Sequence, residues 1–151
     1  MVVFLLDGML GRLARWLRLM GYSALYYPDL EDGELLERAS SGAVLVTRDV
    51  ELHRRAQKQG ADSYLVSSSN HLDQLREVSK AFHLAPRPQS RCTRCNGELR
   101  EATREEVAGK VPPASFKRYR VFWVCRECGK VYWAGSHWGQ IKKVLQGINP
   151  Y

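Results

Sequence analysis

Val2-Val-Phe-Leu-Leu6-Asp7-Gly8 is the stretch of sequence that decides the fold of the first half of this chain. Its five consecutive apolar residues are typical of a strand that is buried on both faces in a parallel sheet. Asp7-Gly8 ends the run, and apolar residues then follow helical spacing from Leu10 to Met20, where Gly21 stops the helix. A buried strand followed at once by a helix of this kind predicts the start of a parallel α/β sheet.

The same alternation continues as far as residue 82. Further strands are expected at 23–27, 43–47 and 63–66, and further helices at 34–39, 50–59 and 72–82. Strands that alternate with helices form a parallel sheet covered on both faces. Leu84–Ser90 contains two prolines, which disfavour helix in the residues before them, so it is interpreted as a linker. The sequence therefore predicts a three-layer α/β domain over residues 1–85 and a second domain over residues 86–151.

Charge divides at the same linker. The 151 residues carry a net charge of +7, with ten basic against eleven acidic residues in 1–85 and thirteen against five in 86–151. Such a basic module favours a polyanionic partner, although basic surface also keeps a small domain soluble. Aromatic residues among its lysines and arginines are typical of surfaces that stack unpaired bases, whereas Trp123 and Trp133 are interpreted as packing residues. No apolar run approaches the roughly 20 residues of a membrane span, and we expect a cytoplasmic protein without membrane contact.

Four cysteines in two pairs predict a zinc ribbon in the second domain. The pairs are Cys92-Thr-Arg-Cys95 and Cys125-Arg-Glu-Cys128, and a two-residue spacing turns both thiolates of a pair toward one ion. Gly97 and Gly129 follow the pairs, where we expect the backbone to bend sharply. Two disulfides or a redox pair fit less well, because no signal peptide is recognised and neither pair lies between a strand and a helix. Four thiolates leave no open position, so the zinc is expected to be structural and the chemistry to lie elsewhere.

Three acidic residues fall at the carboxyl ends of the expected strands, where open α/β sheets bind ligands. Asp7 follows the first strand, Asp49 follows the third, and Asp32 opens the helix after the second; Asp29 and Glu34 are rivals of Asp32. Carboxylates at one edge repel one another unless a cation is present, and hard oxygen ligands suit Mg²⁺ or Mn²⁺. Each aspartate also suits a helix N-cap. We favour a catalytic magnesium or manganese site formed by Asp7, Asp32 and Asp49.

Arginines accompany these acids. Arg12, Arg15 and Arg18 recur every three residues on the first expected helix, opposite its apolar stripe, and Arg48 adjoins Asp49. A guanidinium matches the geometry of a phosphate group. We expect Arg12, Arg15 and Arg48 to bind phosphate, and Arg18 to lie on a solvated helix face.

Several segments form a pattern that extends over nearly the whole chain. They are Leu6–Gly21, Asp32–Leu36, Val46–Asp49, Ser90–Leu99 and Cys128–Trp138. This pattern resembles the RNase domain at the C-terminus of the Mut-seven exonuclease, a branch of the PIN-like nucleases. The resemblance implies a PIN-like, metal-dependent RNase with Asp7, Asp32 and Asp49 as its acidic cluster. PIN-like enzymes often carry a further acid near the end of the fourth strand, where this chain reads Ser67-Ser-Ser-Asn-His71.

The favoured interpretation is a metal-dependent ribonuclease that hydrolyses phosphodiester bonds of single-stranded RNA, with the zinc ribbon assisting RNA binding. The missing fourth acid supports an alternative, a weakly active or inactive RNA-binding or ribosome-associated adaptor. A toxin-like RNase controlled by a partner is a further alternative. The sequence leaves open whether the protein forms a homodimer or has a regulatory partner.

Overall fold

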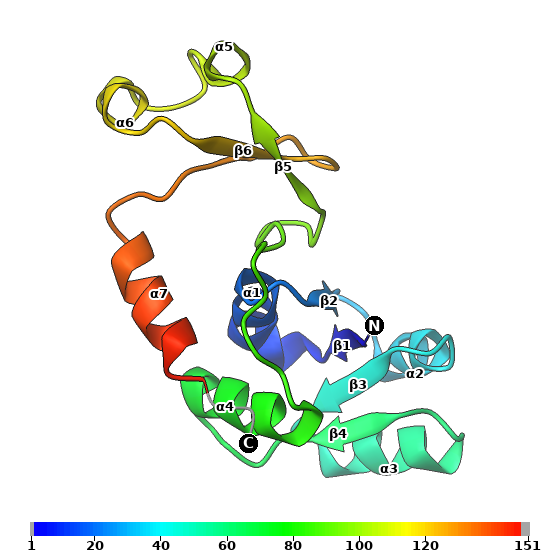
Figure 1. Ribbon diagram of the computed structural model, residues 1–151. Helices are drawn as coiled ribbons and strands as arrows, with labels where there is room; N and C mark the ends of the chain where they lie inside the picture. Colours follow the sequence, from blue (N-terminus) through cyan, green and yellow to red (C-terminus); the bar gives the residue numbers. More distant parts are fainter. Residues whose placement is uncertain (1, 149–151) are drawn as a thin grey trace.

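The computed structural model describes residues 2–148, and its first half is a parallel sheet between two layers of helices (Figure 1). The strands, in the order β2-β1-β3-β4, are β1 (Val3–Leu6), β2 (Ser23–Tyr26), β3 (Val44–Thr47) and β4 (Ser63–Leu65). The helices between and after them are η1 (Gly8–Leu10), α1 (Gly11–Leu19), α2 (Asp32–Ala39), α3 (Val50–Lys58) and α4 (His71–Phe82). Each predicted strand and helix in this half is present with its ends within two residues, so the α/β class is confirmed.

Two apolar clusters fill the two faces of the parallel sheet. Phe4 and Leu6 of β1 lie in a cluster with buried side chains of α1 and α4. Leu5, between them in the sequence, lies in a second cluster with Leu35 of α2 and Leu52 of α3. Successive side chains of a strand point to opposite faces, and both faces here are covered. Burial on both faces explains why the sequence of β1 is an unbroken apolar run.

The second half contains a smaller antiparallel sheet, in the order β5-β6-β7. Its elements are β5 (Leu99–Ala102), α5 (Arg104–Val107), α6 (Pro113–Arg118), β6 (Phe122–Cys125) and β7 (Val131–Tyr132). Two short helices, α5 and α6, lie between β5 and β6. A capping box between Thr103 and Glu106 starts α5, and Pro113, which suits the first turn of a helix, starts α6.

The last helix, α7 (Trp138–Gln146), runs from the small sheet back to the parallel sheet unit (Figure 1). Leu145 and the following Ile148 are buried in the same apolar cluster as Leu13 and Leu17 of α1. The division into domains 1–85 and 86–151 stays a prediction, but the core of the first segment includes side chains of the second. Among residues 2–148, no helix combines the length and apolar character needed to cross a membrane.

Arg18 links the two halves and is buried, so the prediction of a solvated position was wrong. Only 7% of the residue is exposed. Its Nε donates to the Ala24 carbonyl and its Nη1 to the Thr93 carbonyl, both at 2.9 Å. Burial lowers the pKa of Arg18, whereas the nearby Cys92 and Cys95 thiolates raise it. The guanidinium thus connects α1, β2 and the first cysteine pair.

Asn96 makes a second link between the same segments. Its Oδ1 accepts from the Ala24 N–H at 2.9 Å, and its Nδ2 donates to Ser23 Oγ at 3.0 Å. Asn96 has a φ of 73°, a left-handed conformation that asparagine tolerates better than most residues. Strand β2 lies at the edge of the sheet, so Asn96 and Arg18 together satisfy both backbone groups of Ala24 on that edge.

We predict that Arg18→Met lowers the free energy of unfolding by about 2–4 kcal/mol, because it removes the donor from two carbonyl groups at a buried junction. Denaturant unfolding followed by circular dichroism measures the change. Arg15→Met, on the exposed face of the same helix, is the matched control and should change stability by less than about 0.5 kcal/mol. Equal losses in the two variants would contradict the assigned role of Arg18.

Candidate active site and metal centre

Asp7 and Asp49 are joined at the carboxyl-terminal edge of the parallel sheet by the hydroxyl group of Thr47. This hydroxyl donates to Asp7 Oδ2 at 2.8 Å and accepts from the Asp49 N–H at 3.0 Å. The Asp7 N–H in turn donates to the Val46 carbonyl at 3.0 Å. Thr47 is 0% exposed, so its side chain is held in place by the packing around it. Two acids from neighbouring strands are therefore fixed through one buried group.

Each of these two aspartates keeps one carboxylate oxygen without a hydrogen bond to residues 2–148. Asp49 caps α3, since its Oδ1 accepts from the N–H groups of Glu51 and Leu52, and its Oδ2 is left over. Asp7 precedes η1 but makes no side-chain cap bond, and only its Oδ2 is engaged. The N-cap alternative is thus observed for Asp49 alone, and it leaves an oxygen available there.

Asp32 has a different environment. It is the first residue of α2, Glu31 holds the N-cap position, and the Asp32 carboxylate is exposed, as are those of Asp29 and Glu34. Strand β2 lies on the opposite side of β1 from β3, so this acid approaches from the other flank. Within residues 2–148, no three carboxylates bring an oxygen each within 4.8 Å of one another. The three aspartates thus share the predicted edge but do not surround one point.

The arginines predicted to bind phosphate are all exposed. Arg12 and Arg15 lie on α1, Arg48 precedes Asp49, and none of the three has a carboxylate oxygen within 4.0 Å among residues 2–148. The turn that leads from Asp7 to Arg12 is fixed by the Tyr26 hydroxyl, which donates to the Gly8 carbonyl at 2.7 Å.

Gly11 is required at the start of α1 by close packing. A Cβ atom at this position would lie 2.8 Å from the Tyr26 hydroxyl oxygen. A larger residue would therefore displace the tyrosine and the turn that it holds.

Glu77 of α4 places a carboxylate beside the end of β4, and the sequence analysis did not identify it. It accepts hydrogen bonds of 2.8–3.2 Å from the N–H and hydroxyl groups of Ser67 and Ser68 and from the Tyr64 hydroxyl. Burial raises the pKa of Glu77, but these hydrogen bonds outweigh it and lower the pKa to about 2. A carboxylate with five donor groups orders the loop after β4. Ser67 and Ser68 could have indicated this role in the sequence, because adjacent serines after a strand can donate hydrogen bonds to an acid on the next helix.

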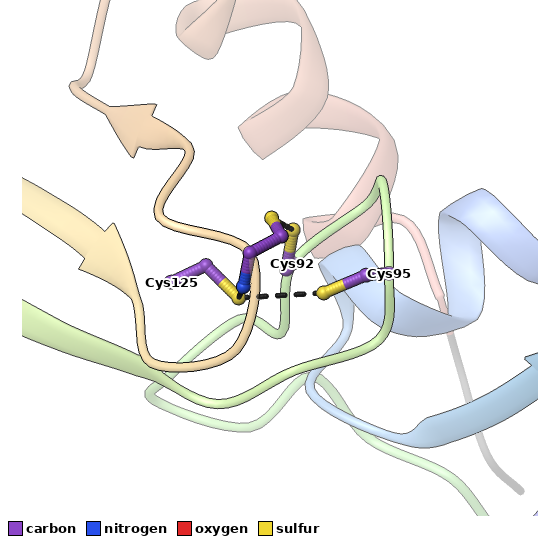
Figure 2. Close-up of side chains that lie close together, drawn as sticks. Cys92, Cys95 and Cys125 are labelled. Atoms are coloured by element: carbon purple, nitrogen blue, oxygen red, sulfur yellow. Dashed lines mark hydrogen bonds between the residues drawn. The ribbon is translucent and has the colours of Figure 1, made fainter.

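The four cysteines converge at one point where the two halves of the chain meet (Figure 2). Cys92 Sγ lies 3.7 Å from Cys128 Sγ, Cys95 Sγ lies 3.4 Å from Cys125 Sγ, and all four sulfurs lie within 4.8 Å of one another. Tetrahedral coordination with metal–sulfur bonds of about 2.3 Å separates sulfurs by about 3.8 Å. The thiols are free rather than paired as disulfides. Their arrangement fits a metal ion such as zinc.

The backbone supports this cluster in two ways. Gly129 has a φ of 78°, as expected for a sharp bend, whereas at the first pair Asn96 rather than Gly97 takes the left-handed conformation. Gly97 is needed for space, since a Cβ there would lie 2.6 Å from Cys125 Sγ. The N–H groups of Glu127 and Cys128 point to Cys125 Sγ at 3.4 and 3.5 Å. Two backbone donors thus hold the Cys125 sulfur in its place in the cluster.

Fold and cysteine cluster define the class of the molecule: an α/β protein with an appended thiol-rich module. Residues 2–145 match the family model described as Mut7-C RNAse domain, and the chain belongs to this family. The resemblance seen in the sequence motifs is thereby confirmed. No curated protein and no solved structure matches the chain.

We predict that Glu77→Gln destabilises the protein by about 1–2 kcal/mol at neutral pH, because the ionised carboxylate is the better acceptor. The pKa of about 2 in the folded protein lies below the ordinary value of 4.5. The contribution of Glu77 is therefore complete above about pH 4.5 and is lost as the pH falls toward 2. Unfolding free energies measured across this range should decline less steeply in Glu77→Gln than in wild type. The control is Glu37→Gln, an exposed acid of α2; identical pH profiles for all three proteins would contradict the assignment.

Proposed function

We propose that this protein is a metal-dependent ribonuclease of PIN-like fold, with its active site at the carboxyl-terminal edge of the parallel sheet. The observation that carries the proposal is the pair of aspartates fixed by Thr47. Both Asp7 and Asp49 keep a free carboxylate oxygen, and both belong to a chain of an RNase-domain family. The family supports RNA as the substrate, and the acids support metal-assisted hydrolysis.

Asp7, Asp49 and Asp32 are the residues that would hold Mg²⁺ or Mn²⁺. Mg²⁺ usually keeps several waters and binds through one or two carboxylates together with a phosphate of the substrate. A fixed pair of acids meets that need, and Asp32 would add a third carboxylate from the other flank. The ion supplies an activated water and charge stabilisation at the phosphate. Arg12 and Arg48 hold and orient the RNA backbone, since a guanidinium pairs with phosphate oxygens.

We further propose that the four cysteines hold one structural zinc ion. Zinc with four thiolates is a closed site without a position for substrate or water. Such a site carries a net charge of −2, and the buried guanidinium of Arg18 beside Cys92 and Cys95 offsets part of it. The zinc thereby stabilises the small sheet and its contact with α1, while the hard-metal site performs the chemistry.

One observation favours a second candidate, an RNA-binding adaptor with weak or no activity. The acids at the sheet edge do not surround a single point, and Glu77 near the end of β4 is already engaged by its own loop. Binding without cleavage is the property that distinguishes this candidate.

Asp7→Asn/Asp49→Asn should reduce cleavage of labelled single-stranded RNA by at least about 100-fold in Mg²⁺ or Mn²⁺, because both fixed carboxylates are lost. Asparagine still accepts the Thr47 hydrogen bond and still caps a helix, so the fold should survive. Asp62→Asn is the matched control, since Asp62 is exposed and precedes β4 at the opposite edge of the sheet.

If wild type leaves the RNA intact in every metal tested, the nuclease proposal is contradicted. If it still binds the RNA, the adaptor becomes the favoured function. Cleavage of equal rate in wild type and the double variant would show that the active site lies elsewhere. Loss of activity in Asp62→Asn would show that the effect is not specific to the proposed site.

One zinc ion per chain is expected by metal analysis of the purified protein. Cys128→Ser should lose this zinc and unfold the small sheet, because folding energy of such modules comes largely from the metal. Asp7→Asn/Asp49→Asn serves as the control, since it should keep its zinc while losing cleavage. Full zinc content and unchanged stability in Cys128→Ser would contradict a four-thiolate site.

A further inference from the structure

A cleft of about 710 Å³ lies where α1, the linker, the small sheet and the start of α7 meet. We propose that this cleft binds unpaired RNA, with bases stacked on its tryptophans and phosphates held by its arginines and lysine. The inference rests on the proposed function in taking RNA as the ligand, and it adds where and in which form the RNA is held. The side chains that carry it are Arg15, Arg118, Trp123, Lys130, Tyr132 and Trp138.

The charge of the cleft favours a polyanion. Its lining includes Arg15, Arg91, Arg118 and Lys130 but no aspartate and no glutamate. Within residues 2–148, Arg91 alone among these has a carboxylate oxygen within 4.0 Å, that of Glu98 at 3.9 Å. The cations come from separate elements and face one space, and Arg15, Arg118 and Lys130 have no carboxylate partner within residues 2–148. This is the electrostatic pattern of a nucleic-acid site.

The aromatic side chains provide stacking surfaces. Three of the four tryptophans of the chain line the cleft. Trp133 packs against Phe122 with ring centroids 6.3 Å apart, in agreement with a packing role. Trp123 and Trp138 are half-buried and make no ring–ring or cation–π contact within residues 2–148, which for Trp123 differs from the packing role expected from the sequence. Their ring faces are therefore free to stack on bases, which is how single strands are held without base pairing.

The size and chemistry of the cleft select an unpaired strand. Its volume lies within the range of pockets that hold one small ligand, so a nucleotide or two fits and a duplex does not. In a duplex the base faces are stacked inside the helix, and a protein meets mainly phosphates and 2′-hydroxyl groups. A site formed by indole rings needs exposed base faces.

Helix α1 connects this cleft with the proposed active site. Arg15 lines the cleft, and Arg12, three residues earlier on the same helix, lies in the first turn after η1. Residues three apart are neighbours on a helix surface, so the two guanidinium groups form a short path for an RNA backbone. This path leads toward Asp7, which precedes η1. Bases held in the cleft thus belong to the single-stranded segment next to the bond that is cut.

The test measures binding in the Asp7→Asn/Asp49→Asn background, so that cleavage does not interfere. A 12-nucleotide single strand should quench the tryptophan fluorescence and bind more tightly than a blunt 12-base-pair RNA duplex. Trp138→Ala should weaken the binding of the single strand by about 5- to 150-fold, the range expected for the loss of one stacked base. Arg118→Glu should weaken it by about 5-fold or more, because an anion replaces a cation that pairs with phosphate. Trp138→Phe keeps a ring and should recover part of the affinity.

Arg55→Glu is the matched control for charge, because Arg55 is exposed on α3, which covers the opposite face of the parallel sheet from α1. Its change should leave binding intact. Equal affinity for duplex and single strand, or unchanged binding in both Trp138→Ala and Arg118→Glu, would overturn the proposal. Zinc content and circular dichroism show that each variant is folded. If wild type cleaves RNA but the cleft variants bind it as well as wild type does, the cleft proposal is overturned and the nuclease proposal stands. If the cleft variants lose binding as expected but wild type cleaves no RNA, the nuclease proposal is overturned and the cleft proposal stands.

Discussion

The free edge of β2 is the constraint on which the arrangement of this molecule depends. An edge strand exposes backbone groups that must find partners, and at Ala24 both partners are side chains, Arg18 and Asn96. Arg18 also reaches the carbonyl of Thr93 inside the first cysteine pair. Both backbone groups of Ala24 at this edge are thereby satisfied, and Arg18 ties the first cysteine pair to the same place. The cleft lies at the same junction, since α1, the linker and the small sheet all contribute to its lining.

The chain keeps two kinds of potential metal ligand apart. The four cysteine sulfurs, which are soft ligands, are gathered where the two halves of the chain meet. The carboxylates of Asp7 and Asp49, which are hard ligands, lie at the edge of the parallel sheet, and each keeps one oxygen without a hydrogen bond to residues 2–148. Under the proposed function, zinc would bind the first set and magnesium or manganese the second, because soft thiolates and hard carboxylates favour different ions. A site whose positions are all filled by protein ligands suits a structural ion, whereas a site with open positions suits an ion that must also bind substrate.

The sequence predicted the elements of residues 2–82 well because their signals are local: an apolar run, a helical period, a glycine stop. It failed where a residue is defined by distant partners. Arg18 looked like one member of an exposed row, but its acceptor Thr93 is 75 residues away. Glu77 was overlooked because its role depends on how α4 folds back on the loop after β4. The cysteine spacing predicted the thiol cluster, whereas the acids share their predicted edge without the close grouping that a cluster implies.

The return of α7 has a consequence for how the protein is made. Leu145 and Ile148 complete an apolar cluster whose other members include Phe4 and Leu6, near the start of the chain. A ribosome synthesises residues in order, so the first strand leaves the exit tunnel long before the side chains that seal its core. Until then the nascent chain exposes apolar surface over α1 and α4. The apolar core on this face of the parallel sheet would thus be completed only after translation has passed residue 148.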